Sequence, residues 1–254
     1  SLETVPSLGR ADIAALNRRL IARDNLVIGI VGAIDAAAAA AALDRIFGDL
    51  PAKAELAAIP TVAPARIGET VISHLDIPQT AIRFGRAGVA RKDADFIAAM
   101  VVNHIFGGGT FQSRLFKEGR EKRGLAYSVS SSLIANEHSA LLFGGTSTKN
   151  ERAGEALQVI REQIASLSTE GPSDEEIEKA KKYITGSYPL RFDSSTKIAA
   201  QLVHMQLDEL GLDWMQRRNA LVNAVSRADV TRVAHRLFGD GALLVAAAGQ
   251  PRGL

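Results

Sequence analysis

The sequence predicts an α+β fold in which an antiparallel sheet is packed with helices on one face. Two observations support this class. In the middle of the chain the apolar, strand-like segments come in consecutive pairs, and after residue 150 several helical segments follow one another before a last apolar strand. Strands and helices that are grouped in this way, instead of alternating one by one, are typical of α+β folds with antiparallel sheets.

The first fifth of the chain contains two predicted helices and one predicted strand. Apolar residues recur at helical spacing over 11–22, and the apolar run 26–31 predicts a buried strand. Asp35 is suited to cap an alanine-rich helix that ends near Phe47. Prolines among small and polar residues over 51–66 predict a linker or extended connection.

The remaining elements follow from the same patterns of apolar residues and turn signals. Asp93 is expected to cap the helix that begins there, and Gly107, Gly108 and Gly109 to end it, because glycine tolerates a positive φ. Strands are predicted over 69–75, 79–85, 125–134, 139–146 and 242–248, and helices over 93–106, 150–168, 173–187, 195–210 and 228–238.

The composition limits the classes of function. With 30 basic and 28 acidic residues the formal net charge is +2, so there is no strong electrostatic case for nucleic-acid binding. The sequence has no cysteine, which excludes disulfides, thiolate zinc sites and a cysteine nucleophile. It also has no run of eighteen apolar residues, so no membrane span is predicted.

An internal repeat connects the two ends of the chain. Residues 10–32 and 227–249 align without a gap, and seven of the 23 positions are identical. Each copy describes a helix near an aspartate, a short loop and an apolar strand that ends at glycine. If the repeat is real, the chain opens inside the end of one repeat and then holds one full repeat, as the C-terminal part of something longer.

The glycine and charge motifs each allow more than one interpretation. Residues 107–109 are not followed by the Gly-Lys-Ser/Thr of a phosphate loop. They could instead end a helix or form a mobile loop beside a ligand site. The segment 113–129 is rich in charges of both signs, and its charge pattern alone favours a solvated helix face with ion pairs one turn apart.

No histidine lies in a recognisable zinc motif. Neither H-E-x-x-H nor H-x-x-E-H occurs. The nearest approach, at 134–138, has isoleucine in place of the first ligand and falls in a predicted strand and turn, so it is interpreted as chance. The other histidines are isolated and are expected to be structural: His74, His104, His204 and His235.

Three segments carry a family resemblance. Residues 103–109 are Asn-His-Ile-Phe-Gly-Gly-Gly, 113–116 are Ser-Arg-Leu-Phe, and 120–129 are Arg-Glu-Lys-Arg-Gly-Leu-Ala-Tyr-Ser-Val. Together they resemble the insulinase/pitrilysin family of zinc peptidases, and more closely the C-terminal half of its bacterial and mitochondrial-processing-peptidase branch. The resemblance covers essentially the whole chain.

This resemblance implies an enzyme made of two homologous α+β halves that face each other around a chamber, in one chain or in two subunits. In the family the N-terminal half carries H-x-x-E-H and a further glutamate, which bind zinc, and the motif glutamate acts as base. This sequence has none of these residues. The resemblance therefore implies no metal and no cofactor in this chain, with zinc in the partner half.

The resemblance also implies how this half contributes to the reaction. An arginine and a tyrosine seven residues apart hold the substrate peptide and polarise its carbonyl, and they match Arg120 and Tyr127. Gly107, Gly108 and Gly109 match a glycine-rich segment linked to substrate handling. Residues 1–52 are then expected to be the tail of the preceding half, 53–66 a linker, and 67–254 the C-terminal peptidase-like domain.

Two alternatives remain open at this point. The chain could be a non-enzymatic scaffold of the same fold, like the core subunits of the respiratory bc1 complex, although a scaffold has no need of Arg120 and Tyr127. It could also be an unrelated α+β binding domain. The compartment follows only from the habits of the family, which favour the bacterial periplasm over the cytoplasm.

Overall fold

The computed structural model describes residues 3–254, which form two compact units. The first unit contains the described residues up to Ile59 together with Pro189–Trp214, and the second contains Pro60–Tyr188 and Met215–Leu254. Within the described residues, no helix is both long and apolar enough to cross a bilayer.

The described part of the first unit contains three α-helices: α1 (Arg10–Leu20), α2 (Ala36–Phe47) and α7 (Ser195–Leu207). The predicted cap of α2 is confirmed, because the Asp35 carboxylate accepts a hydrogen bond of 2.8 Å from the Ala38 amide. Such a bond satisfies one of the free amides in the first turn of a helix.

The predicted strand at 26–31 is wrong. These residues are in no strand, and no strand of the described chain pairs with them. They lie beside α7 instead: the Gln206 side chain donates to the Ile28 carbonyl at 3.2 Å, and a Cβ on Gly29 would lie 2.5 Å from the Ala199 carbonyl oxygen. An apolar run becomes a strand only where another strand supplies hydrogen-bond partners.

The second unit contains a five-stranded sheet in the order β1-β5-β2-β4-β3. All neighbours are antiparallel except β1 and β5, which are parallel. The predicted α+β class is thus confirmed, and the sheet is mixed at one edge. The strands are β1 (Thr70–His74), β2 (Gln79–Ala87), β3 (Ala126–Asn136), β4 (Ser139–Lys149) and β5 (Leu244–Gly249).

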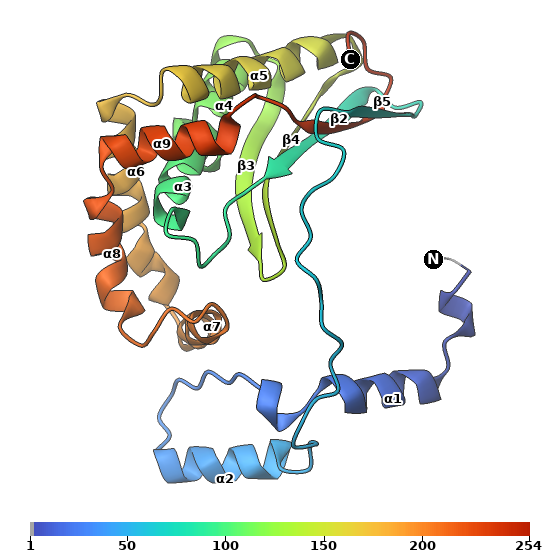
Figure 1. Cartoon of the computed structure of the whole chain (residues 1–254), viewed down its shortest axis with the longest axis vertical. Helices are drawn as coiled ribbons and strands as arrows, with labels where there is room; N and C mark the ends of the chain where they lie inside the picture. The colour runs from blue at the N-terminus through green and yellow to red at the C-terminus, as the bar shows by residue number, and fades with distance from the viewer. Residues whose placement is uncertain (1–2) are drawn as a thin grey trace. The chain divides into compact units, whose positions relative to one another are not determined.

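Helices of the second unit lie on one side of this sheet, and α3, α4 and α5 contact its strands (Figure 1). They are α3 (Phe96–Asn103), the short α4 (Arg114–Phe116), α5 (Ala153–Thr169), α6 (Asp174–Gly186), α8 (Trp214–Ala224, whose first residue is counted with the first unit) and α9 (Arg227–Phe238). Helix α8 was not predicted, because four consecutive polar residues, 216–219, interrupt its apolar pattern.

The core of the second unit lies between the sheet and the helices α3, α5 and α9. Phe106 has no exposed surface, and its ring centroid lies 4.9 Å from that of Phe238 on α9 and 6.3 Å from that of Phe84 on β2. The second contact has the edge-to-face geometry that aromatic rings prefer. This aromatic cluster connects the segment after α3 to both layers.

Asp93 does not cap a helix as predicted. Helix α3 begins at Phe96, and neither Asp93 nor Asp95 makes a side-chain cap for it. Their carboxylates face α9 instead. Arg232 contacts Asp95 at 2.7 Å, and Arg236 contacts Asp95 at 2.6 Å and Asp93 at 2.7 Å. The two carboxylates therefore connect the start of α3 to α9 through a four-charge network.

This network predicts a stability loss in acid. Hydrogen bonds from Arg232 and Arg236 lower the pKa of Asp95 from its ordinary 3.8 to about 2. Since the folded-state pKa is depressed, the network stabilises the fold above about pH 4 and loses this effect as the pH falls toward 2. Asp95→Asn should cost about 1–2 kcal/mol at pH 7, and the melting-temperature gap to the unsubstituted protein should shrink as the pH falls from 4 to 2.

The matched control is Asp174→Asn, since Asp174 also contacts an arginine at 2.7 Å, from Arg227, but both side chains are largely exposed. This variant should leave stability nearly unchanged at both pH values. Thermal unfolding followed by circular dichroism measures the difference in melting temperature between each variant and the unsubstituted protein. A gap for Asp95→Asn that stays constant between pH 7 and pH 2 would contradict the assignment.

Candidate functional site

Arg120 and Tyr127, the two residues that match the family motif, are in contact with each other. The Arg120 guanidinium carbon lies 4.5 Å from the centroid of the Tyr127 ring and 4.9 Å from that of the Phe116 ring. Phe116 is buried, Arg120 is half-buried, and Tyr127 is 83% exposed. The guanidinium is thus held against two aromatic rings, an arrangement in which the ring faces attract the cation.

The local backbone brings the two residues together. Arg120 lies in η5 (Lys117–Lys122), a π-helical segment that continues α4. Gly124 follows with a φ of 56°, and the Leu125 amide donates to the Gly119 carbonyl at 2.7 Å. Glycine adopts this left-handed conformation without the cost that a side chain would add, so the chain can turn back from η5 into β3, where Tyr127 is the second residue.

Arg120 differs from Arg114 and Arg123 in having no acidic partner within the described residues. Arg114 pairs with Glu176 at 2.7 Å, and Arg123 pairs with Glu162 at 2.9 Å. Both partners lie on other helices, so these contacts are not the predicted pairs one turn apart, of which Glu118 and Lys122 form one. Within the described chain, Arg120 makes no ion pair. Its guanidinium donors therefore remain available to an acceptor from outside this part of the structure.

The three glycines follow helix α3, as expected, but they do not end it through a positive φ. None of them has a positive φ; that conformation falls on Thr110, with a φ of 47°. Gly107 belongs to η3 (His104–Gly108), a π-helical continuation of α3. A Cβ there would lie 2.5 Å from the Ser131 hydroxyl oxygen and 2.7 Å from the Ser131 amide nitrogen. Close packing of η3 on β3 is what requires glycine at this position.

Aromatic residues link the glycine segment to Arg120. Phe111, just after the glycines, is 61% exposed and packs edge-to-face on Phe116 at 4.9 Å. Phe116 in turn contacts Arg120. The structure thus joins Arg120 and Tyr127 directly and Gly109 only through Phe111 and Phe116. Sequence reasoning did not assign these two phenylalanines, although Phe116 lies in the Ser-Arg-Leu-Phe motif.

Two π-helical segments border this site. Both η3 and η5 interrupt regular helix, and such segments are rare and frequently occur at functional sites. The non-glycine residue Thr110 between them is held in a left-handed conformation, which also tends to occur where the surrounding structure serves a function. These backbone features mark the surroundings of Arg120 and Tyr127 as the candidate site.

The residues at this site do not fit zinc. Met100, Asn103 and His104 have the spacing of H-x-x-E-H, with a thioether and an amide in place of the first ligand and the base. Asn103 accepts a hydrogen bond of 2.7 Å from Ser131, and the His104 ring lies 4.9 Å from the Tyr183 ring. In the described part of the chain, no three His, Asp or Glu side chains are grouped as metal ligands.

From the sequence alone His104 was interpreted as an isolated histidine, and its place in a substituted H-x-x-E-H spacing was missed. Allowing substitutions at the ligand positions of the motif would have found it. Burial lowers the pKa of His104, which favours the neutral form of the ring. The histidine is therefore suited to packing against Tyr183 in a partly buried place.

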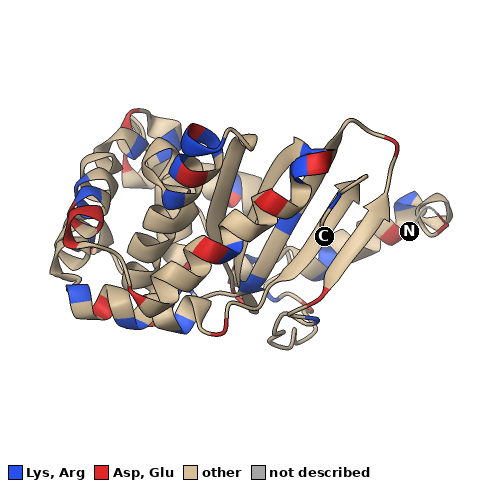
Figure 2. Ribbon diagram, turned by 90° about the horizontal axis from the view of Figure 1, so that it is seen from above, with Lys and Arg blue, Asp and Glu red and all other residues tan. Residues whose placement is uncertain are grey.

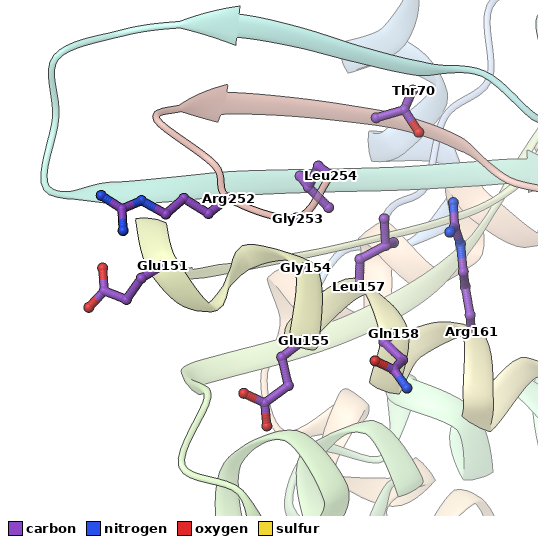
Figure 3. Close-up of a pocket in the computed structure, with 10 residues that line it drawn as sticks. All are labelled: Thr70, Glu151, Gly154, Glu155, Leu157, Gln158, Arg161, Arg252, Gly253 and Leu254. Carbon is purple, nitrogen blue, oxygen red and sulfur yellow. The ribbon is translucent and has the colours of Figure 1, made fainter.

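One cavity lies away from Arg120 and Tyr127. It has a volume of about 660 Å³ and is formed where the last residues of the chain pass the start of α5 (Figure 3). A Cβ on Gly154 of α5 would lie 2.6 Å from the Gly253 carbonyl oxygen, so the two segments pack closely there. Its lining mixes Glu151 and Glu155 with Arg161 and Arg252, and this balance of charge favours no particular ligand.

The chain is similar to several known proteins. The model of a family described as the peptidase M16 inactive domain matches residues 7–184. A protein of Mycobacterium leprae described as an uncharacterized zinc protease is 26% identical over 241 residues, which cover 94% of this chain and 54% of that protein. A Bacillus subtilis protein described as a probable inactive metalloprotease is 28% identical over 226 residues. These residues cover 87% of this chain and 51% of that protein.

A solved structure supports the same relationship. The crystal structure of a peptidase M16 inactive domain from Pseudomonas fluorescens matches with a TM-score of 0.85 and 27% identity, covering 98% of this chain and 60% of that one. The chain spans about half the length of the curated relatives described above.

Proposed function

Because this chain belongs to the family of peptidase M16 inactive domains, we propose that it is the half of a zinc peptidase that holds the substrate. In this proposal a homologous half carries the zinc and hydrolyses the peptide. The resemblance to insulinase-type zinc peptidases that residues 103–129 carry is confirmed by the family match.

The contact between Arg120 and Tyr127 supports the substrate-holding role. The guanidinium is held between the rings of Phe116 and Tyr127 and has no carboxylate partner in the described chain. It can therefore donate hydrogen bonds to a peptide carbonyl, and the exposed Tyr127 hydroxyl can do the same. Donors aimed at a carbonyl oxygen polarise it, and they stabilise the negative charge that develops there when the zinc-bearing half attacks the bond.

The glycine segment has a supporting role in this proposal. Close packing of Gly107 on Ser131 fixes η3 against β3, the strand that carries Tyr127. Phe111 and Phe116 then connect the end of the segment to Arg120. We assign Gly107, Gly108 and Gly109 to the substrate-handling surface on this basis.

The partner half is a proposal of the same kind. The chain spans about half of its curated relatives, which leaves room in a protein of their length for a second half. Residues 1–52 would be the tail of that half, 53–66 the linker and 67–254 the domain that holds the substrate. The partner could equally be a separate subunit.

Reconstitution tests the proposed function. We expect this chain alone to cleave no peptide, and a mixture with the homologous zinc-bearing half to cleave unfolded peptides in a way that a chelator abolishes. Metal analysis of each component locates the zinc. Chelator-sensitive cleavage by this chain alone, with one zinc per chain, would contradict the proposal, and a stable complex without any cleavage would favour the scaffold alternative.

A further inference from the structure

The sheet has a second face, opposite the helices, to which its strands contribute only positive charges. The five strands contain no aspartate or glutamate, and their only Lys and Arg residues are Arg83, Arg86 and Lys149. Figure 2 shows the same contrast, with most charged residues on the helices and the strands mostly tan. Arg86 belongs to the helix side, since it contacts Asp240 at 3.1 Å and donates to the Phe238 carbonyl at 2.7 Å. Arg83 and Lys149 remain for the opposite face.

Arg83 lies near the middle of this open face. It is opposite Gly145 of β4 on one side and Ala246 of β5 on the other, and Gly145 is in turn opposite Ser130 of β3. A Cβ on Gly145 would lie 2.7 Å from the Arg83 Nη1 atom and 2.8 Å from its Cδ atom. The arginine side chain therefore lies across the sheet, over a position where any larger residue would obstruct it.

The Arg83 guanidinium has little to bind within the chain. Nη1 donates to the Ile82 carbonyl at 3.1 Å, and in the described residues Arg83 makes no ion pair. This leaves most of its five N–H donors available. Because a guanidinium presents its donors as a planar fork that matches a carboxylate, a carboxylate is the group that this arrangement fits best.

Two hollows meet at Arg83. One has a volume of about 310 Å³ and is polar, with serine hydroxyls from both β3 and β4. The other, of about 460 Å³, is lined mostly by apolar side chains, among them Leu141, Phe143 and Leu244 from the sheet and Pro64 and Ile67 from the segment before β1. Arg83 and Phe143 line both hollows, so a ligand at Arg83 can reach an apolar side chain into the second one.

The polar hollow begins beside the proposed substrate-holding residues. Ser128, which lines it, directly follows Tyr127, and its carbonyl accepts a hydrogen bond of 2.8 Å from Thr146 of β4. The open sheet face thus continues along β3 from the position where the proposal places the peptide. An extended peptide held near Tyr127 would have Arg83 within the same surface.

We propose that this face is a peptide-binding site in which Arg83 binds a carboxylate and the adjoining apolar hollow binds a large apolar side chain next to it. The substrates expected for this site are peptides with a carboxylate beside an apolar residue. This proposal rests on the proposed function. The carboxylate can be the free C-terminus or an acidic side chain. Its recognition depends on Arg83 and not on Arg120 or zinc.

Fluorescence anisotropy tests the site on the chain itself, without the zinc-bearing half. The probe is an amino-terminally labelled Ser-Gly-Ser-Gly-Ser-Leu with a free carboxylate. We expect saturable binding that falls about tenfold or more when the peptide is amidated, when Arg83 is replaced in Arg83→Gln, or when the terminal leucine is replaced by serine. The matched control is Arg161→Gln on α5, on the helix side. Arg161 is exposed and makes no ion pair with any described residue, so this variant should bind as the unsubstituted chain does.

A second peptide separates the two sources of the carboxylate. An amidated Ser-Gly-Ser-Glu-Leu-Gly that binds in an Arg83-dependent way identifies an acidic side chain as a ligand, and binding of the free-ended probe alone identifies the C-terminus. The proposal is overturned if neither peptide binds, or if binding is equal in the unsubstituted chain and Arg83→Gln. Since no turnover is measured, these outcomes are independent of the reconstitution test of the proposed function.

Discussion

In the peptidase reconstituted with its zinc-bearing half, Arg120→Ala is expected to lower kcat by roughly 10²-fold and to leave the fold intact. The size follows from the loss of a donor that stabilises developing negative charge on a carbonyl oxygen. The fold should survive because Arg120 is only half-buried and makes no ion pair in the described chain. Steady-state cleavage of a peptide, with kcat and KM determined separately, measures the effect.

Tyr127→Phe separates the hydroxyl from the ring. The phenylalanine keeps the surface on which Arg120 lies and removes only the donor, so kcat should fall while thermal stability stays within about 0.5 kcal/mol. Arg123→Ala is the matched control, because Arg123 is on the same segment and contacts Glu162 instead of the aromatic rings. Unchanged kinetics in both Arg120→Ala and Tyr127→Phe would remove the role assigned to the pair.

Phe106→Ala is expected to have the largest effect on stability, a loss of about 3–5 kcal/mol. The ring has no exposed surface and contacts Phe84 and Phe238, so its removal leaves a cavity between the sheet and α9. For a domain of this size the melting temperature should fall by about 6–20 °C. Thermal unfolding by circular dichroism or calorimetry measures the change.

Phe111→Ala is the control for this substitution. It removes the same side chain five positions later, but Phe111 is 61% exposed and packs only on Phe116 among the aromatic rings described. Its cost should stay within about 1 kcal/mol. A similar loss in both variants would mean that the aromatic cluster around Phe106 does not hold the sheet and α9 together.

Local patterns were enough to predict most elements of the second unit. Strands β2, β3 and β4 and helices α5, α6 and α9 occur near their predicted residues, because period-two and helical spacing of apolar residues reflect which face each element buries. The two wrong predictions have a common cause, because in both cases a part of the chain distant in sequence determines what the residues do. Residues 26–31 have the composition of a strand and no partner strand, and Asp93 has the side chain of a cap but contacts Arg236 of α9.

The candidate site likewise has features that the sequence predicted and features that it did not. The spacing of Arg120 and Tyr127 was visible in the sequence, whereas Phe116 beneath the guanidinium was not recognised as its support. The glycines were expected to adopt a positive φ, whereas the feature that requires glycine at Gly107 is the approach of η3 to Ser131 on β3. Arg83 carried no signal at all, because nothing in the sequence shows that its neighbours across the sheet are Gly145 and Ala246.

The sequence by itself determined the α+β class, the family and the absence of an H-x-x-E-H motif, because each is written in local spacing and residue type. Only the tertiary structure decided which side chains meet. It placed Arg120 on Phe116 and Tyr127, paired Asp95 with Arg232, and left Arg83 without an acidic partner in the described chain. The contact between Asp95 and Arg232 joins residues far apart along the chain, and helix packing determines such a contact only once the core has formed.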